Sequence, residues 1–187
     1  LSRTGMMGGL EYELWCDPAD ASIVWRRLLG VGQKVGLRPV GSAVRNIARL
    51  ENGVALEGVD YLSAFTAVDP SDALSPYDLC LGGCVDLDRS VFNGQAALRK
   101  TAESGSRNAL VGFELDLADA GVGGPICNGE QVGRITSYAW SPTLQCTIAL
   151  GLVRASALGA SDGFTIKTQT GENIPAKLTK RPFLRFS

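Results

Sequence analysis

Arg45 and Arg49 are two side chains whose type and spacing could bind an anion. They lie four residues apart in GSAVRNIARLENG, residues 41–53, whose apolar residues have helical spacing. Residues four apart share one helix face, and two guanidinium groups there can hold a carboxylate through forked hydrogen bonds. The alternative is a structural role as ion-pair partners of nearby acidic residues, which we favour for Arg49 and leave open for Arg45. Those acidic residues are Glu51, Glu57 and Asp60.

The sequence contains no histidine, which removes the commonest general base and metal ligand. Chemistry in this chain must therefore rest on carboxylates, arginines, tyrosines or a bound cofactor. The cysteines are odd in number and form no CxxC pair, so they predict neither a disulfide framework nor a zinc site. We interpret them as buried thiols in a reducing compartment. They are Cys16, Cys80, Cys84, Cys127 and Cys146.

The charge balance excludes some classes of partner. The 187 residues carry 18 basic and 19 acidic side chains, a net charge of -1, so no broad positive field exists to hold nucleic acid or an anionic membrane. No apolar run approaches the ~20 residues that span a bilayer, and the opening LSRTGMMGG does not resemble a signal peptide. We therefore expect a cytoplasmic protein.

The elements that must position these residues alternate between strand and helix in the first part of the chain. Residues 12–16 are large and mainly apolar and predict a strand, and Asp17-Pro18 suits the start of a helix. The helix in residues 19–36 should end at Gly36. Four apolar residues at helical spacing should pack against a core. They are Ile23, Val24, Leu28 and Val31.

The helix in residues 41–53 should end at Asn52-Gly53 and turn its apolar side to the core. That side consists of Val40, Val44, Ile47 and Leu50. The segment DLCLGGCVDLD, residues 78–88, predicts a strand broken by a glycine pair, and a short helix is expected from Phe92 to Ala102. The Cys80-x3-Cys84 pair in this segment is expected to pack and not to perform redox chemistry.

The pattern changes near residues 101–108, TAESGSRN, after which short β-rich runs alternate with turn signals such as Asn128-Gly129 and Thr170-Gly171. We place a domain boundary here, dividing the chain into residues 1–104 and 105–187. Five or six short strands in the second part predict a small antiparallel barrel. The runs are ALVGFELDL, QVGRITSYAW, CTIALGLVR, GFTIKTQ and IPAKLTKRPFLRF.

The order of these motifs resembles the C-terminal part of the folate-dependent aminomethyltransferase family. Its type member is the glycine cleavage T-protein, and it includes demethylases and the folate domains of sarcosine and dimethylglycine dehydrogenases. The resemblance covers nearly the whole chain and rests on four segments. They are SRTGMMGGLEYELW, GLRPVGSAVRNIARLENGVALEGVD, SPYDLCLGGCVDLDRSVFNGQAAL, and QVGRITSYAWSPTLQCTIALGLV with the closing IPAKLTKRPF.

The resemblance implies an α+β fold, in which residues 1–104 are the C-terminal portion of the folate-binding α/β lobe and residues 105–187 form the small antiparallel β-barrel. It implies tetrahydrofolate as cofactor and a small methylated substrate. The first half of the family is not present in this sequence, and in the family that half carries the aspartate that acts on the folate nitrogen. We therefore expect a second chain or the missing N-terminal half as partner, and we assign no catalytic residue here.

Gly9 is a departure from the family pattern. Family members commonly read RTGYTGE-x-GYE, and their acidic residue after TG, which holds the amino-pyrimidine edge of the pterin, falls on Gly9 when the segments are laid alongside without gaps. A carboxylate can accept two N–H bonds from such an edge, whereas glycine offers only backbone. Glu11, where the family usually has glycine, could present a carboxylate further along a strand or could be a solvated strand glutamate.

Three further residues become binding candidates through the resemblance. Arg45 matches the arginine of the family's A-R-D-S-L-R-L-E helix, which contacts the carboxylate-bearing tail of folate. Tyr138 and Trp140 lie in TSYAWSPTLQ, where the family places a loop near the ligand tail; packing in a core or interface is the alternative for both.

Two functions follow as hypotheses. The first is tetrahydrofolate-dependent transfer of a methyl or aminomethyl group, or demethylation, by a fragment or subunit of a T-protein-like enzyme. The second is a non-catalytic binding or assembly subunit that keeps the fold but has lost the folate site. Gly9 and the absence of histidine motivate the second hypothesis, so enzymatic activity stays undecided at this point.

Overall fold

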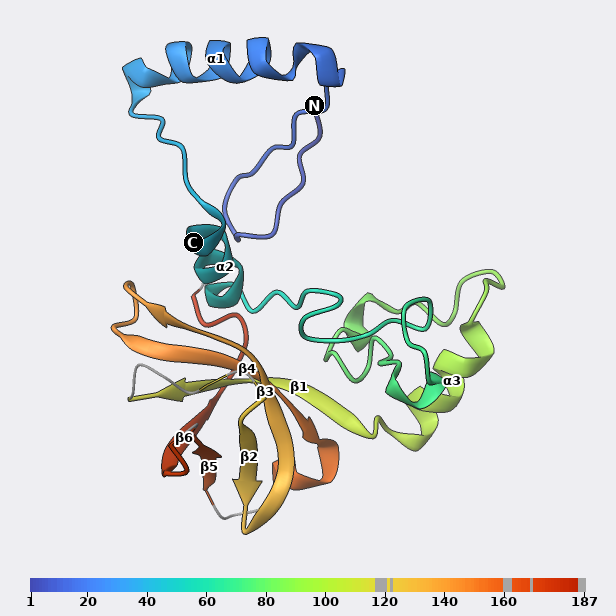
Figure 1. Ribbon diagram of the computed structural model, residues 1–187. Coiled ribbons are helices and arrows are strands. Elements are labelled where there is room, and N and C mark those ends of the chain that lie inside the picture. The colour runs from blue at the N-terminus through green and yellow to red at the C-terminus, as the bar shows by residue number, and fades with distance from the viewer. Residues whose placement is uncertain (117–120, 122, 160–162, 169, 185–187) are drawn as a thin grey trace.

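A closed six-stranded antiparallel barrel dominates the second part of the chain in this computed structural model (Figure 1). The structure describes residues 1–116, 121, 123–159, 163–168 and 170–184. The strands are β1 (Asn108–Leu115), β2 (Pro125–Asn128), β3 (Glu130–Ser141), β4 (Cys146–Arg154), β5 (Phe164–Lys167) and β6 (Asn173–Thr179). They follow the order β1-β4-β3-β2-β5-β6, and pairing between β6 and β1 closes the barrel. The predicted α+β class with its terminal barrel is confirmed.

The strands lie close to their predicted positions because alternating apolar residues mark them. In β1, Phe113 points into the barrel and Leu110 points outward, and β4 alternates in the same way. The exception is β2, which none of the predicted strand segments includes. This strand is only four residues long, PICN, too short for its alternation to be recognised in the sequence. It pairs with β3 through a hairpin at Asn128-Gly129.

The barrel has one core inside and a second on its outer wall. Phe113 and Phe164 meet edge to face inside the barrel, with ring centroids 5.5 Å apart. Gly151 is required there, because a Cβ at this position would overlap the side chains of Phe113 and Ile126. On the outer wall, Leu50 packs against apolar residues of β1 and β4. The barrel therefore offers a fixed surface to the helix that carries Leu50.

Three α-helices precede the barrel, and all three were predicted with small differences in bounds. They are α1 (Ala21–Gly32), α2 (Ser42–Glu51) and α3 (Gln95–Ser104). Asp17 accepts a hydrogen bond from the Ala19 amide at the start of a short 3-10 turn, η1 (Pro18–Asp20), that leads into α1. A second 3-10 turn, η2 (Gln33–Val35), ends at Gly36 in the left-handed conformation. Gly53, also left-handed, follows the C-cap of α2.

Two predicted strands are absent from the described part of the chain. Residues 12–16 contain only an isolated bridge between Ser2 and Glu13, and residues 78–88 form turns with a 3-10 segment, η4 (Gly82–Cys84). A strand is stable only when neighbouring strands complete its hydrogen bonds. The described residues before β1 supply no such neighbours beyond single bridges, which is the physical reason for the difference.

The predicted packing of α1 was also wrong. Ile23, Leu28 and Val31 are exposed, and α1 lies apart from the barrel at one end of the molecule (Figure 1). Val40 and Val44 are exposed as well, so α2 buries only the part of its apolar side around Leu50. The helices are encoded locally by their periodicity, but the surface that should cover α1 is not among the described residues.

The cysteines are not buried thiols as predicted. Cys16, Cys80 and Cys84 are exposed, and Cys127 and Cys146 are half-buried. All five are free thiols.

Across the described ranges, no helix is both long enough and apolar enough to cross a bilayer.

Candidate functional site

The C-terminal end of α2 is the place where distant parts of the chain meet. The carbonyl of Glu51 accepts hydrogen bonds from the amides of Phe183 and Leu184, at 2.9 and 3.0 Å, near the end of the chain. The Glu51 side chain accepts a bond of 2.6 Å from Ser141 of β3. Gly8 of the N-terminal loop also lies against Asn52 at this end of the helix. The helix is thus fixed between the barrel and both terminal segments.

Glu11 closes the N-terminal loop on itself. Its Oε1 accepts a bond of 2.6 Å from the Met7 amide, and its Oε2 accepts one of 3.0 Å from the Met6 amide. The carboxylate lies directly over Gly5, where a Cβ would overlap it. Glu11 is therefore neither a free strand carboxylate nor a purely solvated one, because the backbone here bends into a turn and offers it two N–H donors.

Gly9 lies at the open side of this loop. A Cβ built at Gly9 would meet nothing within 4 Å, so a larger side chain fits there. Gly9 and Glu11 line one hollow of about 230 Å³ together with other loop residues and with Asn52 and Val54. The structure therefore brings these two predicted residues together beside the end of α2.

Asn52 is a residue of this hollow that the sequence reasoning missed. Its side-chain amide lies against Gly8, where an added Cβ would come within 2.4 Å of Asn52 Oδ1. The amide makes no hydrogen bond to any described residue, so its acceptor and donors are available to a ligand. The Asn52-Gly53 pair signalled a helix end, and nothing in that signal indicated that the side chain would face the loop.

Arg49 has a structural role, as we favoured. Its Nη1 donates to Asp60 Oδ2 at 2.6 Å and its Nη2 to Ser137 Oγ at 2.8 Å, and both charged side chains are almost fully buried. Asp60 Oδ1 accepts further bonds from Thr136 and Ser137, each at 2.6 Å. Ser137 follows a β-bulge in β3, which turns its hydroxyl toward this pair. This network joins α2 to the barrel.

Arg45 remains the free member of the arginine pair. It is exposed on α2, and its side chain makes no hydrogen bond or ion pair with the described residues. The two arginines therefore do not act as one clamp, because Arg49 is fully engaged by Asp60. Arg45 keeps its donors for a ligand or for protein outside the described ranges.

Tyr138 and Trp140 lie on β3, away from the N-terminal loop. Tyr138 is half-buried, packs against the barrel core and lines a hollow of about 360 Å³ with Asn46 and Arg49. Trp140 is 42% exposed. Asn46 and Asn52 belong to different hollows and lie six residues apart, which is about 9 Å along a helix. Gly9 and Glu11 thus share one hollow, whereas Tyr138 lines another.

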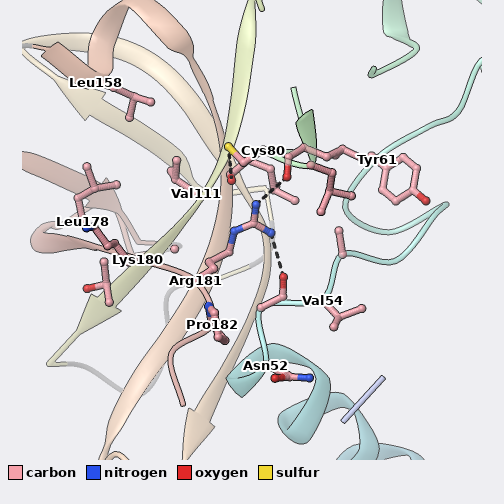
Figure 2. A pocket seen from close by; sticks show the side chains of 17 residues that line it. Asn52, Val54, Tyr61, Cys80, Val111, Leu158, Leu178, Lys180, Arg181 and Pro182 are labelled. Carbon is pink, nitrogen blue, oxygen red and sulfur yellow. Dashed lines mark hydrogen bonds between the residues drawn. The ribbon is translucent and has the colours of Figure 1, made fainter. Parts of the chain in front are cut away.

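A larger cavity of about 770 Å³ lies between the end of α2 and the barrel (Figure 2). Asn52 and Val54 border it, but none of the predicted site residues does. Within the part of the chain that the structure describes, no group of three or more His, Cys, Asp and Glu could hold a metal ion.

Comparisons with known proteins match both parts of this architecture. A family model described as the GCVT N-terminal domain matches residues 1–86. A second, described as the glycine cleavage T-protein C-terminal barrel domain, matches residues 108–184. The two matches follow one another along the chain and together cover most of it.

Individual aminomethyltransferases are also similar to this chain over nearly its full length. An aminomethyltransferase from Halothermothrix orenii is 36% identical over 188 residues, covering 98% of this chain and 49% of the relative. One from Moorella thermoacetica is 33% identical over 189 residues, covering 99% and 48%. The chain spans about half the length of the curated relatives it matches.

A solved structure shares the fold. The crystal structure of glycine cleavage system aminomethyltransferase T from Bartonella henselae has a TM-score of 0.73 to this chain, covers 90% of it and 45% of its own chain, and is 23% identical in sequence. Taken with the two family models and the relatives, this shows that the chain belongs to the glycine cleavage T-protein family.

Proposed function

We propose that this chain contributes one half of an enzyme that transfers a methyl or aminomethyl group to tetrahydrofolate, with a small methylated compound as donor. The observation that carries the proposal is the succession of the two family domains along one chain, at residues 1–86 and 108–184. Demethylation is the variant of this reaction in which the donor leaves without its methyl group. We place the enzyme in the cytoplasm, in keeping with its five free thiols.

The hollow beside Gly9 is the place we assign to the pterin. It is open where a Cβ at Gly9 would stand, and the Asn52 amide faces it without a partner. No carboxylate is free to anchor the ring here, because both oxygens of Glu11 already accept hydrogen bonds from the Met6 and Met7 amides. We propose that Asn52 and the backbone of the loop bind the ring edge there, and that the exposed Arg45 meets the carboxylate tail.

The cofactor supplies the one-carbon acceptor when it is bound, and the described residues hold and orient it. Proton transfer at the folate nitrogen requires a group that we do not find among the residues that the structure describes. We propose that the remaining half of the family fold supplies this group, as more of the same polypeptide or as a second chain. The exposed apolar residues of α1 offer that half a surface to cover.

The two domains are proposed to divide near residues 104 and 105. In support, α3 ends at Ser104 and β1 begins at Asn108. Gly105, between them, has a positive φ of 80°, a conformation that favours glycine. Limited proteolysis should cut first in this connection if the division is right.

The first test is native mass spectrometry of the purified protein, before and after addition of tetrahydrofolate. We expect the chain to be found with the other half of the fold and that assembly to bind one tetrahydrofolate. A half-length chain that alone binds tetrahydrofolate tightly and turns it over would overturn the proposal of a shared site. A full assembly that does not bind tetrahydrofolate would overturn the proposed function.

The Gly9→Glu variant tests the position of the pterin. A carboxylate there can accept charge-assisted bonds of about 1.5 to 3 kcal/mol each, so tetrahydrofolate affinity in the full assembly should rise at least about tenfold. The space at Gly9 admits the side chain without a clash. Unchanged affinity would show that the pterin does not bind at this loop.

A further inference from the structure

The 770 Å³ cavity between α2 and the barrel has the size of a small-molecule site. One wall comes from residues 52–55 and 79–81, before the barrel. The other comes from β1, from Leu158 in the 3-10 segment η5 (Ala155–Gly159), and from residues 178–182 at the end of β6 and beyond it. A ligand here would touch both parts of the molecule at once.

The wall of the cavity is mostly apolar. Figure 2 shows Val111, Leu158 and Leu178 on the barrel side, with Val54 and Tyr61 across from them. Leucines at positions 79, 81 and 110 also contribute. An apolar lining of this kind favours a hydrocarbon chain or a ring over a polar sugar or nucleotide.

The charged residues of the wall have a single sign. Lys180 and Arg181 line the cavity, and no aspartate or glutamate does. Arg181 donates to the carbonyls of Gly53 and Leu79, at 2.9 and 2.8 Å, and forms no ion pair with a carboxylate of the described residues (Figure 2). The Cys80 side chain also interacts with Arg181. A guanidinium has five N–H donors, so these three contacts leave others available.

Arg181 is thus a half-buried cation without a direct ion pair among the described residues, and the carboxylate that acts on it from a distance, Asp60, is already paired with Arg49. Burial lowers the pKa of its guanidinium from the usual value, the direction expected when desolvation disfavours the charged form. Burying a charge is costly unless an opposite charge accompanies it, and a carboxylate can pair with a guanidinium fork through two parallel hydrogen bonds.

We propose that this cavity binds an amphipathic monocarboxylate, with its apolar body between the barrel wall and residues 54–61 and its carboxylate at Arg181. The cavity adjoins the loop hollow that we assign to the pterin and shares Asn52 and Val54 with it, but Arg181 lines the cavity and not the loop hollow. The proposal does not depend on the proposed function. Because both parts of the molecule line the cavity, the ligand would stabilise their contact.

Octanoate is the probe, with octanol and octyltrimethylammonium as neutral and cationic counterparts, titrated into the chain by calorimetry at pH 7. We expect octanoate to bind at least tenfold more tightly than either counterpart. Equal binding of octanoate and octanol, or no binding of octanoate, would overturn the proposal. Tetrahydrofolate should not compete with octanoate, and competition would show that the cavity belongs to the folate site instead.

Leu81→Glu places a carboxylate at the rim, where the leucine is half exposed and its replacement leaves the core intact. This change should weaken octanoate binding at least tenfold through repulsion. Val91→Glu makes the same change in charge at an exposed valine outside the cavity and should leave binding unchanged. Equal effects of the two variants would overturn the proposal.

Arg181→Gln should abolish the preference for octanoate over octanol. If that variant does not fold, the comparison of Leu81→Glu with Val91→Glu tests the proposal in its place.

Discussion

The barrel and the residues before it differ in how they use their apolar side chains. In the barrel, apolar residues alternate between an inner core and an outer wall, and both are covered. Among the described residues, the large apolar side chains that stay exposed lie almost entirely before β1, and only Trp140 and Leu178 follow it. The barrel therefore covers most of its own apolar surface, whereas the first part leaves many large apolar side chains exposed. The half-length match to the relatives fits this difference.

The largest effect should come from the barrel core. Phe113 is fully buried against Phe164, so Phe113→Ala should lower the free energy of unfolding by about 4 kcal/mol through lost burial and the cavity left behind. Phe65, which is 97% exposed before the barrel, is the matched control. Phe65→Ala should change stability by less than about 0.5 kcal/mol in urea denaturation. Similar losses in the two variants would contradict the comparison.

The contact between the two parts should be the next most sensitive feature. Asp60→Asn leaves the Arg49 guanidinium buried without its counter-charge, which should cost about 3 kcal/mol in the same measurement. An additional Arg49→Met change should recover part of this loss, because it removes the uncompensated charge. Glu57→Gln changes an exposed carboxylate three residues away, whose hydrogen bond from Thr66 an amide oxygen can still accept, and should cost less than about 0.5 kcal/mol. If Glu57→Gln cost as much as Asp60→Asn, the buried pair would not be what joins α2 to the barrel.

The sequence predicted the barrel much better than the packing of the first part, for a physical reason. CTIALGLVR is a short, nearly continuous apolar run between turns, as expected of a strand buried on both faces, so β4 occupies the predicted residues. The helix α1 was equally visible from its periodicity, but periodicity only indicates which side is apolar and not whether anything covers it. The strand predicted at residues 12–16 failed for the same reason, since its partner strands would have to come from elsewhere.

The residues of the candidate site could likewise be predicted only in part from the sequence. The resemblance pointed to Gly9 and the neighbouring Glu11, and the structure places both in one hollow. Asp60 was one of three nearby acidic residues proposed as partners of Arg49, and the structure shows that it is the one that pairs. Asn52 and Arg181 could not be found in the sequence, since their positions depend on how the chain ends fold back onto α2.

A smaller, local effect is expected in the N-terminal loop, which is ordered by Glu11 and not by a core. Glu11→Gln weakens the acceptors for the Met6 and Met7 amides, so hydrogen exchange at these two amides should quicken roughly tenfold. Exchange in the barrel strands should not change. Asp20→Asn, an exposed change just before α1, is the control for altered charge. Unchanged exchange at Met6 and Met7 in the Glu11 variant would show that the carboxylate does not hold the loop.

The smallest effect should come from the barrel surface, where Lys177 and Glu114 pair across β6 and β1 at 2.7 Å. The hydrogen bond to Glu114 raises the pKa of Lys177 above its usual 10.5. A raised pKa means that the folded state holds the proton more tightly than the unfolded state, so the contribution is complete below pH 10.5 and is lost as the pH rises through the higher value. Lys177 is exposed and screened by water, so Lys177→Met should barely change the melting temperature at pH 8, and that small difference should vanish at higher pH. A loss at pH 8 comparable to that of Phe113→Ala would mean that surface pairing, and not the covered cores, makes the barrel the more stable part.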